Sequence, residues 1–136
     1  MPPLLPSPAT PAACPCGSAA AYDACCGPLV RNEQQASGPE QLMRSRYTAY
    51  SVGGTDHLFR TWHPATRPEL IAPDDDLAWT RLEILDVVEE ADGDPGAGIV
   101  EFRAHWAWHG QTGALHERSR FTRRAGRWVY LDGETP

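Results

Sequence analysis

All four cysteines of this 136-residue chain fall within thirteen residues, at Cys14, Cys16, Cys25 and Cys26. A disulfide inside either close pair would be strained, because the bond needs roughly 4.4–6.8 Å between Cα atoms in a specific orientation. Four soft ligands in two pairs suit tetrahedral zinc instead. Since the four thiolates would fill the coordination sphere, the sequence predicts one structural zinc ion and no catalytic metal. Chance clustering and thiol redox chemistry are the alternatives.

A second group of residues that could do chemistry lies further along the chain: Arg46, Tyr50, His63, His105 and Glu117. Arg46 and Tyr50 share a helix face at i, i+4 spacing. His105 lies on the polar face of a predicted strand, and Glu117 lies on the next one. A histidine beside a carboxylate could act as a general base. The favoured interpretation is a structural network of ion pairs and hydrogen bonds that joins helix to sheet.

The cysteines belong to a short module over residues 14–28. Fifteen residues cannot build a core, so the metal must supply the folding free energy. Ser18 is a good N-cap for a helix over 19–24, which Gly27-Pro28 would end. This helix would carry the second cysteine pair at its end, facing a turn that carries the first pair.

The residues after the module are expected to form one α+β domain over 39–136. A helix is predicted from Pro39 to the Gly53-Gly54 pair, and a shorter helix over 56–62. Apolar and polar residues then alternate with period two, which is typical of strands. Four strands are expected, over residues 82–88, 100–108, 115–124 and 128–131.

The flanking segments have a different composition. Residues 1–13 are rich in proline and alanine and are expected to be disordered or extended, and residues 29–38 are interpreted as a linker. The first residues lack a basic region and contain prolines, so no secretory signal is predicted. No stretch approaches the roughly 18 apolar residues of a membrane span, and a cytoplasmic location is therefore expected.

The basic residues are 12 arginines and no lysine, against 18 acidic residues, for a formal net charge of −6. This balance argues against a generic nucleic-acid binder, whose affinity comes from cationic surface. Six arginines and one acid lie in residues 103–127, and ten acids and one arginine lie in residues 69–94. Such opposite blocks are expected to pair across strands rather than to face a ligand.

The aromatic residues Phe102, Trp106 and Trp108 occupy alternate positions of one predicted strand. They are interpreted as core, or as a sheet face through which two copies form a homodimer. A platform that stacks RNA bases is the less favoured alternative.

Two sets of motifs resemble known families. The spacing Cys-x-Cys, eight residues, then Cys-Cys, with Gly17, Ser18, Tyr22 and Gly27 around it, resembles the SEC-C zinc motif, named for the C-terminus of the SecA translocation motor. The rest resembles the YchJ family, whose members join SEC-C to a domain similar to nuclear transport factor two. The matching blocks are residues 42–50, 61–64, Arg67-Pro68 and 115–121. This resemblance implies a cone in which helices pack in the mouth of a curved antiparallel sheet, with a cavity between them.

The resemblance carries little function with it. SEC-C in SecA implies zinc and docking to a protein partner, so the leading hypothesis is a zinc-binding protein with a protein-interaction or adaptor module. The motif's usual lysines are absent, which argues against an electrostatic grip on an acidic partner; their positions hold Ala20, Ala21, Asp23 and Ala24. The alternative hypothesis is a small-molecule enzyme or binding protein of hydrolase, isomerase or dehydratase type that uses the cavity. The sequence favours a non-enzyme without deciding the matter.

Overall fold

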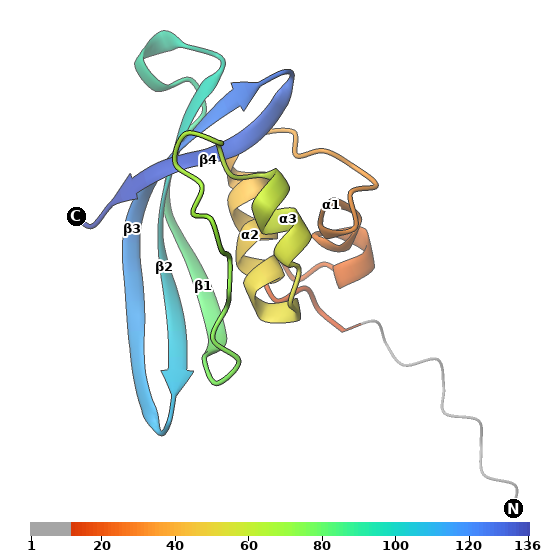
Figure 1. Ribbon diagram of the computed structural model, residues 1–136, viewed down its shortest axis with the longest axis vertical. Helices are drawn as coiled ribbons and strands as arrows, with labels where there is room; N and C mark the ends of the chain where they lie inside the picture. Colours follow the sequence, from red (N-terminus) through yellow and green to blue (C-terminus); the bar gives the residue numbers. More distant parts are fainter. Residues whose placement is uncertain (1–11) are drawn as a thin grey trace, which may run out of the picture.

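The computed structural model describes residues 12–136, so most of the predicted tail lies outside the described residues. Helices pack on one four-stranded antiparallel sheet in the order β1-β2-β3-β4, which confirms the predicted α+β class (Figure 1). The helices are η1 (Tyr22–Ala24), α1 (Gly27–Val30), α2 (Pro39–Val52), α3 (Thr55–Arg60) and η2 (Ala91–Gly93). The strands are β1 (Ala78–Val88), β2 (Ala97–Trp108), β3 (Gln111–Arg124) and β4 (Arg127–Glu134).

Helix α2 begins and ends where the sequence predicts. Pro39 occupies its first turn, where a missing N–H costs nothing, and Gly53 follows it with φ 76°, a left-handed conformation that suits glycine. Helix α3 is shorter than the predicted 56–62. Its chain leaves the helix at Trp62, which forms a bridge with Tyr130 of β4.

Two tight turns connect the last three strands. His109-Gly110 has φ values of 45° and 77°, and Ala125-Gly126 has 52° and 79°. Positive φ at both central residues is the backbone of a two-residue hairpin. β3 therefore begins at Gln111, four residues before the predicted start at Leu115. β3 changes register at Arg120 and Phe121, and β4 crosses the other strands steeply there (Figure 1).

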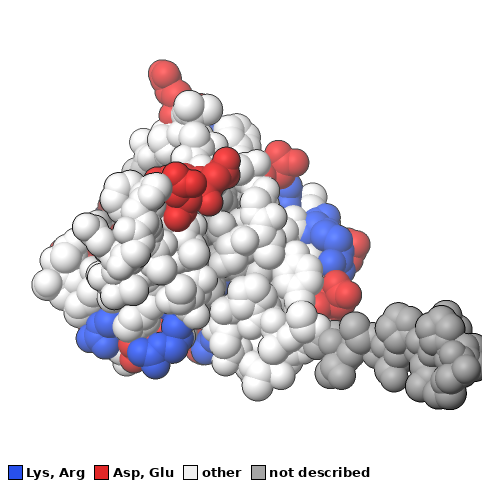
Figure 2. Space-filling model, turned by 90° about the horizontal axis from the view of Figure 1, so that it is seen from below, with Lys and Arg blue, Asp and Glu red and all other residues white. Residues whose placement is uncertain are grey.

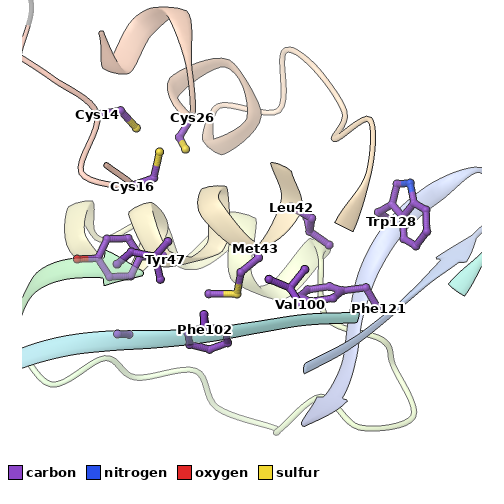
Figure 3. Close-up of a cluster of buried hydrophobic side chains, with 12 residues drawn as sticks. Cys14, Cys16, Cys26, Leu42, Met43, Tyr47, Val100, Phe102, Phe121 and Trp128 are labelled. Carbon is purple, nitrogen blue, oxygen red and sulfur yellow. The ribbon is translucent and has the colours of Figure 1, made fainter. Parts of the chain in front are cut away.

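The cysteine module packs directly on α2. Three of its cysteines belong to the same buried cluster as Leu42, Met43 and Tyr47 of that helix. Figure 3 places the sulfur atoms on one side of α2 and the sheet on the other. The module and the α+β domain therefore share one core, and α2 is its middle layer.

The local structure of the module differs from the prediction. Residues 19–24 do not form one helix, because Ala21 forms a bridge with Ala13 and the Cys14 N–H donates to the carbonyl oxygen of Ala20. Only the 3₁₀ helix η1 remains of the predicted helix. Gly27-Pro28 begins α1 rather than ending a helix, since proline is favoured in a first helical turn. α1 thus runs across the expected boundary between module and linker.

Opposite charges meet on the face of the sheet that points away from the helices. Arg103 lies 3.6 Å from Glu83, and Arg118 lies 2.9 Å from both Asp86 and Glu101. Two ion pairs, Arg103–Glu83 and Arg118–Asp86, join the two charge blocks across strands as predicted. On the face drawn in Figure 2, charged residues lie in small clusters at the edges and one acidic cluster near the middle, and uncharged surface covers the rest. Over residues 12–136, no helix combines the length and the apolar character needed to cross a membrane.

Candidate metal centre and cavity

The four cysteine sulfur atoms converge on one point. All four lie within 4.8 Å of one another, with 3.7 Å between Cys16 and Cys25 and 3.9 Å between Cys25 and Cys26. Figure 3 shows the side chains of Cys14, Cys16 and Cys26 directed toward one another. A tetrahedral zinc ion with bonds of about 2.3 Å would separate its sulfur ligands by about 3.8 Å. The donor set and its spacing therefore fit a four-thiolate metal site.

Glycines allow the two cysteine pairs to approach each other. Gly17 has φ 82°, and its N–H donates to the carbonyl oxygen of Cys14 at 3.1 Å, which closes the turn around the first pair. A Cβ at Gly27 would lie 2.9 Å from the carbonyl oxygen of Tyr22. A side chain at position 27 would therefore force the backbone next to Cys26 to shift.

Two hydroxyl groups touch the sulfur atoms from outside the site. Thr48 Oγ1 of α2 lies 3.7 Å from Cys14 Sγ, and Ser18 Oγ lies 3.1 Å from Cys25 Sγ. A hydroxyl that donates to a thiolate stabilises its negative charge and orients the ligand. The contact from Thr48 also ties the site to α2.

The thiols perturb one another. Hydrogen bonding with Cys26 lowers the pKa of Cys16 to about 4, and the same contact raises the pKa of Cys26. Adjacent thiols therefore do not all ionise together by themselves, whereas a divalent cation stabilises four thiolates at once. Arg44 of α2 adds positive charge nearby, because its Nη1 donates to the carbonyl oxygen of Cys16 at 2.8 Å.

A cavity of about 280 Å³ lies between α2 and the sheet, on the side of α2 that faces away from the cysteines. Its walls are mostly aromatic or aliphatic, with few polar groups, as is usual for small-molecule sites. The lining residues are Met43, Arg46, Tyr47, Tyr50, Trp62, Trp79, Phe102, Ala104, Leu115, Glu117, Ser119 and Tyr130.

Among the described residues, Arg46 is the only cation that lines this cavity, and it is 5% exposed. Its guanidinium packs against two aromatic rings that lie edge-on to each other, 4.8 Å from the centroid of Trp62 and 4.9 Å from that of Tyr130. Nη1 donates to the carbonyl oxygen of Leu58 at 3.0 Å and to the hydroxyl of Thr61 at 2.8 Å. Burial lowers the pKa of Arg46 to about 10, so the side chain stays charged at neutral pH.

Glu117 supplies the opposite charge on the sheet side. Its Oε2 accepts hydrogen bonds from the hydroxyl of Ser119 at 2.5 Å and from that of Tyr130 at 3.0 Å. Burial and the charge of Glu117 raise the pKa of Tyr130. Among the described residues, Glu117 forms no ion pair with Arg46, so the expected ion pair between helix and sheet is absent. The ring of Tyr130 contacts both groups and holds them apart.

The five predicted pocket residues do not all converge. Arg46, Tyr50 and Glu117 line the cavity, but His63 and His105 do not. His105 Nε2 lies 2.5 Å from Glu83 on the opposite face of the sheet. The register explains this, because Glu117 pairs with Phe102 and therefore shares a face with the apolar residues of β2.

His63 belongs to the segment that follows α3. Its backbone N–H donates to the carbonyl oxygen of Tyr130, and its Nδ1 accepts from the N–H of Ala65 at 3.0 Å. Its ring thus organises a local turn, outside the cavity. Among the described residues no histidine lines the cavity, so the predicted approach of a histidine to Glu117 does not occur there.

Sequence reasoning did not single out three aromatic walls of the cavity: Trp62, Trp79 and Tyr130. Trp79 packs 6.3 Å from the ring of Tyr47, and Trp62 lies edge-on to Tyr130 at 5.3 Å. The indole Nε1 of Trp62 is buried and has no acceptor in the described part of the chain. Period-two alternation in β4 indicates which face Tyr130 occupies, but no local pattern indicates that Trp62 meets it.

Family models and known proteins match this chain. Residues 12–28 match the model of the SEC-C motif, and residues 38–133 match the model of the middle, NTF2-like domain of YchJ. The UPF0225 protein SCO1677 of Streptomyces coelicolor is 48% identical over 123 residues, which cover 89% of this chain and 94% of the relative. The UPF0225 protein YchJ of Shigella dysenteriae is 44% identical over 129 residues, 90% of this chain and 83% of the relative.

Two solved structures have the same fold. The solution structure of RPA3114, a SEC-C motif containing protein from Rhodopseudomonas palustris, has a TM-score of 0.80 and 36% identity, covering 92% of this chain and 99% of that one. The crystal structure of a SEC-C motif containing protein from Psychrobacter arcticus has a TM-score of 0.74 and 24% identity, covering 88% of this chain and 80% of that one. The cysteine cluster, the sheet with its helices and these relatives lead to one conclusion: the chain belongs to the YchJ (UPF0225) family, in which a SEC-C motif precedes an NTF2-like domain.

Proposed function

We propose that this protein binds one zinc ion, and that the ion is structural. The spacing of the four sulfur atoms, at 3.7 and 3.9 Å between neighbours, supports this proposal most directly. Thiolate ligands in a tetrahedral arrangement select zinc over hard cations such as magnesium and calcium. Four protein ligands leave no open position for substrate, so the metal takes no part in a reaction.

The metal's role follows from where the module packs. Cys14, Cys16 and Cys26 are buried in the same cluster as the residues of α2 that face the module. The metal would hold this layer on α2, and α2 carries Arg46 and Tyr50 on the cavity side. The zinc site would thereby stabilise the helix that forms one wall of the cavity.

Metal analysis tests the zinc proposal. Protein purified without added metal should contain one equivalent of zinc, and Co²⁺ exchanged into the site should give the absorption of a tetrahedral thiolate complex. Cys16→Ser should lose the metal, whereas Ser18→Ala, which keeps all four ligands, should retain it. Substantially less than one equivalent in a fully reduced sample, with no other metal bound, would contradict the proposal.

A second function, the binding of a small molecule in the cavity, is favoured by one observation. Arg46 is buried and charged, and no carboxylate among the described residues lies within ion-pair distance of it. An unpaired buried charge is costly, and an occupant of the cavity that accepts hydrogen bonds would offset this cost.

Thermal-shift screening of a metabolite library tests the second function. Ala104 is 3% exposed and lines the cavity, so Ala104→Leu would fill space there without altering a polar group. A compound that raises the melting temperature of the native protein should have no effect on this variant. Ligands that stabilise both proteins equally would place their site elsewhere and contradict the assignment.

The expected protein partner of the module stays a prediction. The exposed residues of the module are mostly small and uncharged, and its single acidic residue, Asp23, already pairs with Arg31 at 3.0 Å. Apart from the thiolates themselves, the module therefore presents few charged groups to a partner.

A further inference from the structure

We propose that the cavity binds a small amino-acid-like molecule, whose carboxylate meets Arg46, whose ammonium group meets Glu117 and whose apolar body packs on the aromatic walls. This inference rests on the small-molecule function proposed for the cavity and names its ligand class. It is independent of the zinc site.

Arg46 forms the end of the cavity that would bind the carboxylate of the ligand, which accepts hydrogen bonds. A guanidinium has five N–H donors in a planar fork, and Nη1 uses its two on Leu58 and Thr61. The donors on Nε and Nη2 have no acceptor among the described residues. Contacts with the rings of Trp62 and Tyr130, together with the two hydrogen bonds of Nη1, restrict the position of the guanidinium. A preorganised, unpaired fork in an apolar cavity suits a carboxylate.

Glu117 forms the end of the cavity that would bind the ammonium group of the ligand, which donates hydrogen bonds. Both protein hydrogen bonds to its carboxylate arrive at Oε2, from Ser119 and Tyr130. Oε1 accepts none from the described residues, and no arginine or histidine among them lies within ion-pair distance of this carboxylate. An ammonium or N–H group of a ligand would supply the missing partner.

The two ends are close enough for one head group. The guanidinium of Arg46 is 4.9 Å from the centre of the Tyr130 ring, and the hydroxyl of the same ring donates to Glu117 at 3.0 Å. A simple anion would be attracted by Arg46 and repelled by Glu117, and a simple cation the reverse. A molecule that carries both charges is attracted by both groups.

The walls define the rest of the ligand. Trp79 packs at 6.3 Å from both Tyr47 and Tyr50, and Phe102 and Leu115 continue the apolar lining. Aromatic walls favour an aromatic or large aliphatic body. A volume of about 280 Å³ is small for a ligand site, so the body is about the size of one side chain.

Calorimetric titration with three probes tests the ligand class. L-phenylalanine carries both charges, 3-phenylpropionate carries only the carboxylate, and phenethylamine carries only the amine. In the native protein L-phenylalanine should bind at least about tenfold more tightly than either analogue, since each charged hydrogen bond lost costs about that factor. Equal affinities, or tighter binding of 3-phenylpropionate, would overturn the proposal. So would binding of L-phenylalanine weaker than about 1 mM.

A variant of Glu117 tests the contact with the ammonium group separately from the contact with the carboxylate. Glu117→Gln keeps an oxygen for Ser119 and Tyr130 but removes the charge, so L-phenylalanine should weaken at least about tenfold while 3-phenylpropionate tightens. Glu101→Gln is the matched control, because that carboxylate lies on the opposite face of the sheet beside Arg118 and should not affect binding. Loss of the L-phenylalanine preference in both variants, or in neither, would contradict the proposed contacts.

Ala104→Leu distinguishes failure of the ligand class from failure of the cavity function. If library compounds bind only when Ala104 is intact but L-phenylalanine does not bind, the cavity is a ligand site of another class, and this inference is wrong. If L-phenylalanine binds the native protein and Ala104→Leu equally well, its site lies outside the cavity, and both the inference and the cavity function are wrong.

Discussion

We expect the stability of this protein to fall in mild acid because of His57. It lies in α3, is 4% exposed, and its Nε2 is 2.8 Å from the hydroxyl of Ser45. That hydroxyl donates to the carbonyl oxygen of Leu42, so Nε2 must carry the proton and donate to Ser45. Burial, and then the positive charges of Arg46 and Arg60, lower the pKa of His57 from 6.5 to about 4.

The sign and size of the effect follow from proton linkage. Because the pKa of His57 is lowered in the folded state, the unfolded chain takes up the proton first as the pH falls. The stabilisation is fully present above about pH 6.5 and is lost as the pH falls through about 4. A difference of about 2.5 pKa units corresponds to about 3 kcal/mol in the free energy of unfolding.

Urea unfolding at several pH values measures the effect. The native protein should lose about 3 kcal/mol more between about pH 7 and pH 4 than His57→Gln, whose side-chain amide can still donate to Ser45 but does not titrate. Subtracting the two curves removes contributions common to both, including protonation of the cysteines. His109→Gln removes an exposed histidine that lies 3.2 Å from Asp76 and leaves His57 in place, so this control should keep the part of the pH dependence that His57 causes.

Two results would refute this reasoning. One is a parallel loss of stability in the native protein and in His57→Gln across the same pH range. The other is a pKa of His57 in the folded protein that lies at or above its ordinary value, as measured by NMR of the imidazole ring protons. Either result would mean that His57 is not held neutral by its surroundings.

Three further predictions follow from the packing. Chelation of the metal should speed hydrogen exchange of the α2 amides as well as those of the module, because three cysteines share the core of that helix; unchanged protection of α2 would show that the module is independent. Glu117→Gln should lower the free energy of unfolding by less than about 2 kcal/mol, since both hydroxyl bonds can persist; a loss of about 3–5 kcal/mol in denaturant titration would reveal a buried ion pair. Gly98→Ala should destabilise by about 1–3 kcal/mol, because its Cβ would lie 2.6 Å from Cγ of Pro39; a neutral effect would contradict that close packing.

Local sequence signals predicted much of the fold. Pro39 and Gly53 bound α2 because proline is preorganised for a first turn and glycine for a left-handed end. The alternation of apolar and polar residues predicted the strands, because successive side chains of a strand point to opposite faces of the sheet. The convergence of the four cysteines was also expected from their spacing, because four soft ligands within thirteen residues have few other uses.

The charged groups of the cavity depended on contacts between distant segments. Glu117 and His105 were expected near each other, but the β2–β3 register puts them on opposite faces of the sheet, and a shift of one residue would reverse that. Arg46 and Glu117 were expected to pair, but Tyr130 comes between them when Trp62 joins β4.

The sequence by itself therefore determined which residues are helical, which are extended and which can hold a metal, because these properties depend on neighbours along the chain. Only the tertiary structure decided that the cysteine module is part of the core and that α2 separates the cysteine cluster from the cavity. It also decided that Arg46 and Glu117 form no ion pair within the described part of the chain. Those features depend on which surfaces meet, and the free energy of that packing is shared among residues up to a hundred positions apart.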